Sequence, residues 1–245
     1  MSFRRGCLIP ESIPMDSALW EFKETLEDLK TLEQGDPYTF ASQYQQWPSP
    51  IGGGLFKDEN WKYYEVLPSD ITTVRIYCDT AQEVNSWNDY TVFQCWAKSA
   101  KSGIYLVDQL RGKWESPEIE RNLVDFWNKH KPNVYKPKGA DMLKIEKASS
   151  GSGLIQAIKK QYTIPVQPIV RHKDKLTRAM AVIKYFCSGY IHLPLNETWV
   201  SDYKSEFRAF TPMMTHKHDD QLDPTFDAVE DLLVFPQALY TNDSI

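Results

Sequence analysis

The stretch 72–110, TTVRIYCDTAQEVNSWNDYTVFQCWAKSAKSGIYLVDQL, decides the fold. Apolar and polar side chains alternate over 72–79, which gives a strand two different faces, with Asp79 at its end. Two more strands are predicted at 91–97 and 104–110, with the turn between them at 101–103. Three consecutive strands with short connections predict an antiparallel meander.

Helices and strands alternate after this meander. Ser116 and Pro117 fit the N-cap and the first position of a helix that turns Ile119 and Leu123 inward. Further strands are predicted at 142–145, 166–170 and 190–193, and further helices at 153–161, 176–187, 200–210 and 223–238. This order predicts an α/β fold with a mixed central sheet flanked by helices.

The N-terminal part has a different character. An amphipathic pattern predicts a helix at 22–32, and the chain then passes through an aromatic, polar segment to the prolines and glycines of 48–54. We therefore expect a boundary at Gly54, with a helical linker segment at 1–54 and a larger domain at 55–245.

The composition excludes several classes of protein. The chain has 245 residues and is 42% hydrophobic, which is enough for a sizeable core. No apolar run approaches the roughly 18 residues of a membrane span, and the N-terminus lacks the apolar core of a secretory signal. Four cysteines without CxxC spacing indicate reduced core thiols of a cytosolic protein. With a net charge of -5, any binding to nucleic acid must come from local basic patches.

Several familiar catalytic motifs are absent. The glycines at 52–54 and 151–153 lack the lysine of a phosphate-binding loop, which excludes nucleotide hydrolysis by that mechanism. Neither a GxSxG nor an HExxH motif occurs, so acyl transfer and zinc proteolysis are disfavoured.

Carboxylates at the ends of separate elements remain as candidates. Asp79 ends the first predicted strand and Glu146 ends the fourth, while Asp219, Asp220 and Asp223 cluster before the last helix. Hard divalent cations need oxygen ligands, and two neighbouring ions need carboxylates from different elements. Taken singly, a strand-end Asp is usually a turn former and a Glu a solvated charge, so only the whole constellation indicates a metal site.

The C-terminal acids allow two arrangements. If Pro224 is the first helical residue, Asp223 is the N-cap, and Asp219 and Asp220 are free to turn toward a metal. If the helix begins near Asp219, Asp220 and Asp223 lie on one helix face and both could bind metal. The first arrangement is favoured and the second stays open.

Short segments between 78 and 223 carry a family resemblance. They are CDTAQ at 78–82, NDYTVF at 88–93, IYLVDQLRGKW at 104–114, IE at 145–146, SGSGLIQ at 150–156, KDKLTRA at 173–179 and HDDQLD at 218–223. In this order and spacing they resemble the nuclease domain of tailed-phage terminase large subunits. Upstream, YTFASQYQQ at 38–46 and GGGLF at 52–56 are similar to the segment that joins that nuclease to its packaging ATPase.

The resemblance implies a ribonuclease H-like fold whose central sheet places the first and fourth strands side by side. It further implies that two Mg²⁺ or Mn²⁺ ions are bound by Asp79, Glu146 and one or more of Asp219, Asp220 and Asp223. The catalytic acids would be Asp79, Glu146 and Asp220. Asp89 and His218 are candidates to contact these ligands without binding metal themselves; the alternatives are a turn residue for Asp89, which is favoured, and a surface histidine for His218.

The implied reaction is endonucleolytic cutting of concatemeric, double-stranded viral DNA during genome packaging in the host cytoplasm. The portal protein and the small terminase subunit would be partners in the full assembly, and no membrane would take part. DNA phosphates would be contacted by a locally basic segment whose alternative is an ordinary solvated surface: Arg171, Lys173, Lys175 and Arg178.

Some positions depart from the family pattern. Lys147 and Ala148 follow Glu146 where the family usually has Asp and Lys, and Pro224 stands where it usually has Ala. The packaging-ATPase motifs are missing, so we expect an excised domain or the product of a split or decayed prophage gene. Two alternatives stay open. One is another ribonuclease H-like nuclease such as a Holliday-junction resolvase, and the other is an inactive remnant that only binds DNA or a capsid partner.

Overall fold

The computed structural model describes residues 25–35, 55–80, 90–134, 137–147, 149–211 and 219–234. The chain divides into two compact units. The first contains Met1–Lys57 and Arg208–His216, and the second contains Asp58–Phe207 and Lys217–Ile245.

The first unit contains the helix α1, Leu26–Gly35. The helix follows Thr25 because Thr25 and Asp28 cap it reciprocally: the Asp28 amide donates to Thr25 Oγ1 at 3.2 Å, and the Thr25 amide donates to Asp28 Oδ2 at 3.1 Å. The predicted helix at 22–32 overlaps α1, and residues 22–24 lie outside the described residues. In the same unit the Leu55 amide donates to the Phe210 carbonyl at 3.2 Å.

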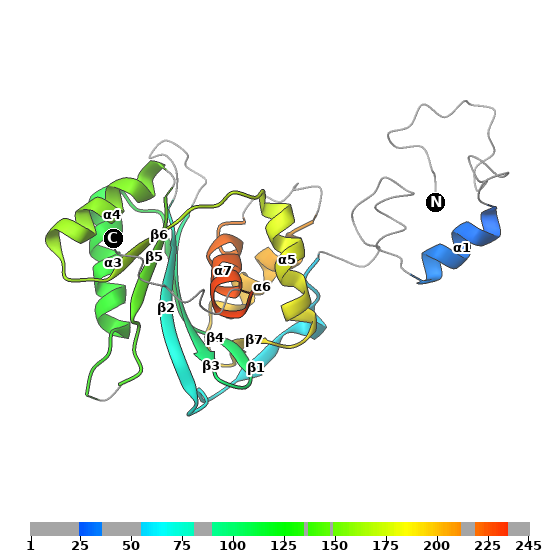
Figure 1. Ribbon diagram of the computed structural model, residues 1–245, viewed down its shortest axis with the longest axis horizontal. Coiled ribbons are helices and arrows are strands. Elements are labelled where there is room, and N and C mark those ends of the chain that lie inside the picture. Colours follow the sequence, from blue (N-terminus) through cyan, green and yellow to red (C-terminus); the bar gives the residue numbers. More distant parts are fainter. Residues whose placement is uncertain are drawn as a thin grey trace, which may run out of the picture. The chain divides into compact units, whose positions relative to one another are not determined.

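A seven-stranded mixed sheet lies at the centre of the second unit (Figure 1). The strands are β1 Lys62–Tyr64, β2 Ile71–Asp79, β3 Thr91–Ser99, β4 Gly103–Gly112, β5 Met142–Glu146, β6 Val166–Ile169 and β7 Ile191–Pro194. Their order in the sheet is β1-β7-β4-β3-β2-β5-β6. The meander β2-β3-β4 is antiparallel, and β5 and β6 continue the sheet parallel to β2. The predicted mixed α/β fold and the pairing of the first and fourth predicted strands, β2 and β5, are confirmed.

The edge strand β1 was not predicted from the sequence. It is only three residues long, which is too short for a periodic pattern to be recognised. It pairs in parallel with β7, and β7 pairs in parallel with the beginning of β4.

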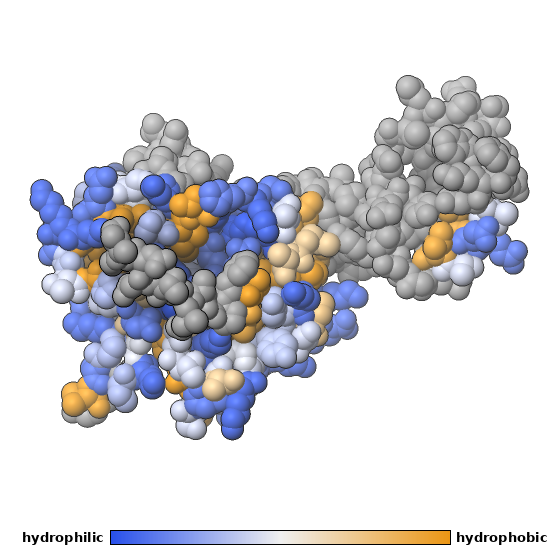
Figure 2. Space-filling model, viewed as in Figure 1, coloured by the Kyte–Doolittle hydropathy of each residue, from blue (hydrophilic) through white to orange (hydrophobic). Residues whose placement is uncertain are grey.

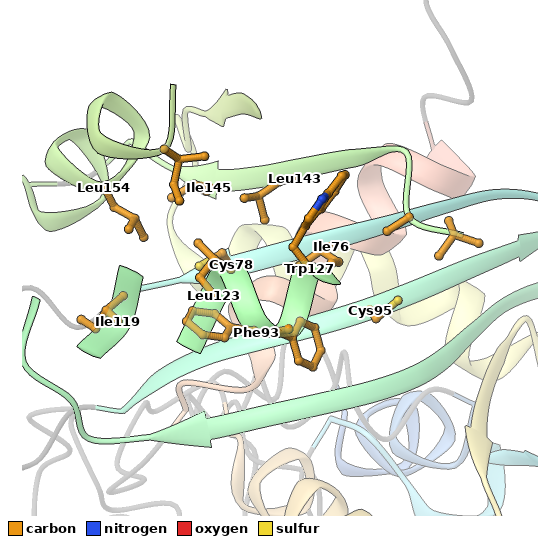
Figure 3. Packing of buried hydrophobic residues seen from close by; sticks show 14 of the residues in the cluster. Ile76, Cys78, Phe93, Cys95, Ile119, Leu123, Trp127, Leu143, Ile145 and Leu154 are labelled. Carbon is orange, nitrogen blue, oxygen red and sulfur yellow. The ribbon is translucent and has the colours of Figure 1, made fainter. Parts of the chain in front are cut away.

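Helices α3 (Ser116–His130) and α4 (Ser149–Gln161) cover one face of the sheet (Figure 1). In Figure 3, Cys78 of β2 lies beside Leu123 of α3 and Ile76 lies beside Trp127, within a buried apolar cluster. Burial of each large side chain in this cluster contributes about 1.5–3 kcal/mol to folding. The N-cap of α3 is Glu115 and not Ser116, because the Glu115 amide is bound by the Glu118 carboxylate at 3.3 Å.

Helices α5 (Lys175–Cys187), α6 (Val200–Ala209) and α7 (Leu222–Val229) lie on the opposite face of the sheet (Figure 1). A π-helical turn, η3 (Glu230–Val234), continues α7, and a 3-10 turn, η2 (Asp58–Asn60), precedes β1. Tyr77, whose side chain alternates with those of the apolar cluster, donates to Asp231 of η3 at 2.6 Å. The alternation along β2 therefore turns one set of side chains toward α3 and α4 and the other toward α7 and η3, and both faces of the sheet are buried. The predicted helix at 223–238 starts at Leu222, and its part beyond 234 lies outside the described residues.

The cysteines agree only in part with the sequence prediction. Cys78 and Cys95 are buried free thiols, whereas Cys187 is exposed and Cys7 lies outside the described residues. On the face seen in Figure 2, the described surface of the second unit is mostly hydrophilic, with small apolar patches. None of the helices in the described part combines the length and the apolar character that crossing a membrane requires.

Candidate functional site

Three neighbouring strands end at the same edge of the sheet. Because β2, β5 and β6 run parallel, their carboxyl ends lie together, which is where ligands bind in many α/β folds. Asp79 is the last residue of β2, Glu146 is the last residue of β5, and Arg171 follows β6 by two residues. The strand order alone therefore brings two acids and one arginine to one place.

A cavity of about 390 Å³ opens at this edge. It is lined by Asp79, Thr80, Tyr90, Glu146, Arg171, Lys173, Lys175, Arg178, Asp219, Asp220 and Asp223. Five of these are the acids proposed from the sequence as metal ligands, and four are the cations proposed as DNA contacts. Residues far apart in the chain, from β2, β5, α5 and the start of α7, thus converge as one site. Asp89 and His218 lie outside the described residues, and nothing places them near these ligands.

Arg171 lies among the acids of the cavity. Its Nη1 is 2.7 Å from Glu146 Oε2, 3.5 Å from Asp79 Oδ2 and 3.9 Å from Asp223 Oδ2. Its Nη2 is 2.7 Å from Asp227 Oδ2. One guanidinium therefore contacts carboxylates from β2, β5 and α7.

Helix α5 contributes two further cations to the acids of α7. Lys175 Nζ lies 2.6 Å from Asp223 Oδ2 and 2.7 Å from Asp219 Oδ2. Arg178 donates to Asp223 Oδ1 and, at 2.5 Å, to Asp227 Oδ1. Since an unpaired buried charge is costly, these pairs fix α7 against α5.

Asp227 was missed by the sequence analysis. It is 4% exposed and joins Arg171 and Arg178, so it belongs to the charge network of the site. The spacing of four residues from Asp223 puts both acids on one face of α7, and that spacing could have identified it.

The acids of the site differ in pKa. Burial raises the pKa of Asp79 well above its usual value, and the nearby carboxylates of Asp223 and Glu146 act in the same direction, while Arg171 opposes them. Burial also acts to raise the pKa of Asp223, but Arg171, Lys175 and Arg178 together hold it below its usual value. The site therefore contains one acid that binds a proton readily and one that stays ionised, as is typical of functional clusters.

The start of α7 corrects the favoured arrangement of the C-terminal acids. The N-cap position is Gln221 and the helix begins at Leu222, so Asp223 is not the N-cap but lies inside the first turn. The N-terminal end of α7 is held instead by Glu206 of α6, whose Oε1 accepts a hydrogen bond from the Gln221 amide at 2.6 Å. Pro224 is tolerated because it is still within the first turn, where its missing amide hydrogen costs no hydrogen bond.

Asp219 and Asp220 precede the helix and face different partners. Asp219 pairs with Lys175, and Asp220 lies 3.3 Å from Arg111 Nη2. Arg111 in turn lies 3.2 Å from Glu206 and stacks over the Tyr90 ring, 3.9 Å from its centroid. Glu206 lies outside every quoted motif, and Arg111 lies within the segment 104–114 without a charge pattern that would single it out.

The four predicted DNA contacts occupy different environments. Arg178 is 3% exposed and bound to two acids, and Arg171 and Lys175 are also engaged by carboxylates. Lys173 is exposed at the cavity. Of the four, only Lys173 combines exposure with a place in the cavity wall.

The donor set of the site fits hard divalent cations. The described residues hold no group of three or more His, Cys, Asp or Glu side chains already arranged around a metal position, and Arg171 and Lys175 lie between the acids instead. The oxygens of Asp79, Glu146 and Asp223, however, are the ligand type that Mg²⁺ and Mn²⁺ prefer. Burial is the main cause of the raised pKa of Asp79, and the nearby carboxylates of Asp223 and Glu146 add to it; a bound cation would favour the ionised form.

Comparisons with known proteins agree with this geometry. The family model described as the terminase RNaseH-like domain matches residues 76–232. No curated protein sequence matches the chain.

Solved structures of phage terminases are similar in fold. A large terminase from a thermophilic bacteriophage is 15% identical, with a TM-score of 0.56, and the match covers 86% of this chain and 54% of that one. The P22 large terminase nuclease domain is 11% identical, with a TM-score of 0.51, and the match covers 72% of this chain and 91% of that one. The large terminase nuclease of thermophilic phage G20c with bound magnesium is 13% identical, with a TM-score of 0.52, and the match covers 72% of this chain and 96% of that one. The match therefore spans about half the length of the first large terminase and nearly all of the two isolated nuclease domains.

Proposed function

This chain belongs to the family of terminase RNase H-like nuclease domains, and from that premise we propose that it cuts concatemeric viral DNA by metal-dependent hydrolysis of phosphodiester bonds. The observation that carries the proposal is the convergence of Asp79, Glu146 and Asp223 in one cavity. These acids come from two strand ends and one helix, as a site for two hard cations requires.

Asp79, Glu146 and Asp223 would hold the ions, with Asp219 and Asp220 in the lining of the same cavity. When bound, Mg²⁺ or Mn²⁺ supplies a water of lowered pKa as the nucleophile and stabilises negative charge on the leaving oxygen. The magnesium bound in the G20c nuclease supports the assignment of this metal class. In its apo form, Asp79 holds a proton more readily than an ordinary aspartate and must lose it to act as a ligand.

The cations of the site have separate tasks in this proposal. Lys173, exposed at the cavity, would contact a DNA phosphate and help to orient the strand. Arg178, buried against Asp223 and Asp227, would position the ligand Asp223 and not reach the DNA. Lys175 bridges Asp219 and Asp223 and would hold the loop before α7 against the site.

The wider assembly follows from the same family. We propose double-stranded viral DNA as the substrate, with the portal protein and the small terminase subunit as partners in the host cell. Residues 1–54 would form the linker toward a packaging ATPase. The match covers only about half of the thermophilic phage's large terminase. The substrate and partners proposed here are therefore those of a whole large terminase, and the site described above is the part that this chain contributes.

A plasmid-cleavage assay tests the proposed function. Supercoiled plasmid incubated with the full chain and Mn²⁺ should become linear, and EDTA should abolish the reaction. Glu146→Gln should be inactive, since it removes a proposed ligand, whereas Glu120→Gln, on α3, should cleave like the parent. Full activity in EDTA, or in Glu146→Gln, would exclude the proposed mechanism.

A further inference from the structure

The guanidinium of Arg171 occupies the centre of the acid cluster formed by Asp79, Glu146, Asp223 and Asp227. Its Nη1 faces Glu146 at 2.7 Å and Asp79 at 3.5 Å, while its Nη2 holds Asp227 at 2.7 Å. The side chain is only 12% exposed. A cation is thus built into the position where the carboxylates converge.

Arg171 is also the counter-charge on which Asp79 and Glu146 depend. Lys175 and Arg178 pair with the α7 acids Asp223 and Asp227. Among the ion pairs of the described residues, Asp79 and Glu146 pair with Arg171 alone. Without this guanidinium, two carboxylates at adjacent strand ends would face each other without a neutralising group, at a high cost in a partly buried site.

We propose that Arg171 is a resident counter-cation that competes with divalent metal ions for Asp79 and Glu146, an inference that rests on the proposed metal-dependent function. A metal ion bound to these two acids would lie within a few ångströms of Nη1 and would be repelled by it. Metal loading therefore requires Nη1 to leave Glu146 and Asp79. The contact of Nη2 with buried Asp227 keeps the side chain anchored while Nη1 moves.

This arrangement has two consequences for the chain. In the absence of metal, Arg171 stabilises the folded state by neutralising the acids. In the presence of metal, it lowers the affinity of the site, because each ion must displace a positive charge that is already in place. Removing the charge should therefore lower the stability of the metal-free protein and raise the affinity of the site for metal ions.

Arg171→Gln and Lys173→Gln form a matched pair for testing this. Both remove one positive charge from the lining of the same cavity, but Lys173 forms no ion pair with a described carboxylate. Mn²⁺ affinity is measured by calorimetry on the full chain without DNA, and melting temperature is measured with EDTA and with Mn²⁺. Compared with the parent, Arg171→Gln should have a lower melting temperature in EDTA and should bind Mn²⁺ at least about tenfold more tightly. Addition of Mn²⁺ should also raise its melting temperature by more than that of the parent. Lys173→Gln should stay within about twofold of the parent, since its charge is screened by solvent.

The outcomes separate this inference from the proposed function. If the parent binds Mn²⁺ and Arg171→Gln binds it equally or more weakly, Arg171 does not compete with metal ions, while the proposed metal site remains supported. Binding by Arg171→Gln alone would support the competition. Binding by neither protein would contradict both. If Arg171→Gln does not fold with or without Mn²⁺, Arg171→Lys takes its place. Lysine keeps the charge but lacks the two terminal nitrogens with which the guanidinium holds Glu146 and Asp227 at once. The contact with Glu146 and Asp79 should therefore weaken and Mn²⁺ affinity should rise; an unchanged affinity would overturn the inference.

Discussion

Arg178 of α5 and Asp227 of α7 form a buried ion pair, with Nη2 2.5 Å from Oδ1 and exposed side-chain fractions of 4% and 2%. The same guanidinium also binds Asp223 through its other terminal nitrogen. Since Asp223 is a proposed ligand, the position of the site depends on a contact between two helices that the sheet alone does not determine.

Loss of this pair should destabilise the protein. Arg178→Ala leaves Asp227 buried with fewer partners, so we expect the free energy of unfolding to fall by about 3–5 kcal/mol. Chemical denaturation in EDTA measures the change. Lys159→Ala, an exposed position on α4, serves as the control and should change stability by less than about 0.5 kcal/mol. A loss below about 1 kcal/mol in Arg178→Ala would show that the pair does not fix α7.

The raised pKa of Asp79 predicts a pH-dependent stability of the apo protein. The folded state keeps the Asp79 proton at pH values where the unfolded chain, with a pKa of about 3.9, has released it. The folded state then binds more protons, so this residue makes stability fall as pH rises above about 4, by at most about 1.4 kcal/mol per pH unit.

Asp79→Asn removes this dependence. The melting temperature of the variant, minus that of the parent, should therefore increase from pH 4 to pH 8 in EDTA. Thermal unfolding followed by circular dichroism gives the values. A difference that decreases with pH would mean that the Asp79 carboxylate is favoured in its ionised form.

Asp231 should act in the opposite direction. Burial acts to raise its pKa, but hydrogen bonds from Lys144, Tyr77 and Arg75 hold the pKa below the usual value. The stability it contributes is complete above the unfolded pKa of about 3.9 and is lost as pH falls through the lower folded value. Asp231→Asn should lower the free energy of unfolding by about 1.5–3 kcal/mol at pH 7 and by less near pH 2. An equal loss at both pH values in denaturant titrations would rule out this electrostatic role.

Asp223→Asn tests the position of Asp223 inside α7. Because this side chain faces the cavity and is not an N-cap, the substitution should weaken Mn²⁺ binding by at least about tenfold. Asp202→Asn, at an exposed position on α6, is the control and should bind as the parent does. Calorimetry with Mn²⁺ distinguishes the two roles, since parent-like affinity in Asp223→Asn would remove Asp223 from the ligand set.

DNA binding should depend on Lys173. Lys173→Ala should weaken binding of duplexes of any sequence and reduce the slope of log affinity against log salt by about 1. Fluorescence anisotropy in Ca²⁺, which should not support cutting, gives the affinities over a range of salt concentrations. If the slope matches that of Lys159→Ala, Lys173 does not contact a phosphate.

Much of the fold could be read from β2–β4 and the alternating elements that follow. The period of two along residues 72–79 distinguishes the side chains that pack on α3 from those that face α7, because successive strand residues point to opposite faces. The paired strand ends of Asp79 and Glu146 followed from the family resemblance. The edge strand β1 was missed because its pairing with β7 is set by tertiary contacts and not by local pattern.

The acids and cations of the site were identifiable, but their pairing was not. The sequence shows that Arg171, Lys175 and Arg178 are basic, and basic residues most often lie on the solvated surface. The packing of α5 against α7 turns Lys175 and Arg178 toward Asp223 and Asp227, and the end of β6 brings Arg171 to Asp227. The start of α7 was placed wrongly for a related reason: Glu206, fifteen residues upstream of Gln221, holds the helix end in place of a local cap.

Anomalous diffraction from a crystal soaked in Mn²⁺ tests the central claim most directly. The account predicts Mn²⁺ density between Asp79, Glu146 and Asp223, with ligand oxygens about 2.0–2.2 Å away and Nη1 of Arg171 withdrawn from Glu146. Mn²⁺ density elsewhere on the chain, or an unaltered contact between Arg171 and Glu146 at saturating Mn²⁺, would contradict it.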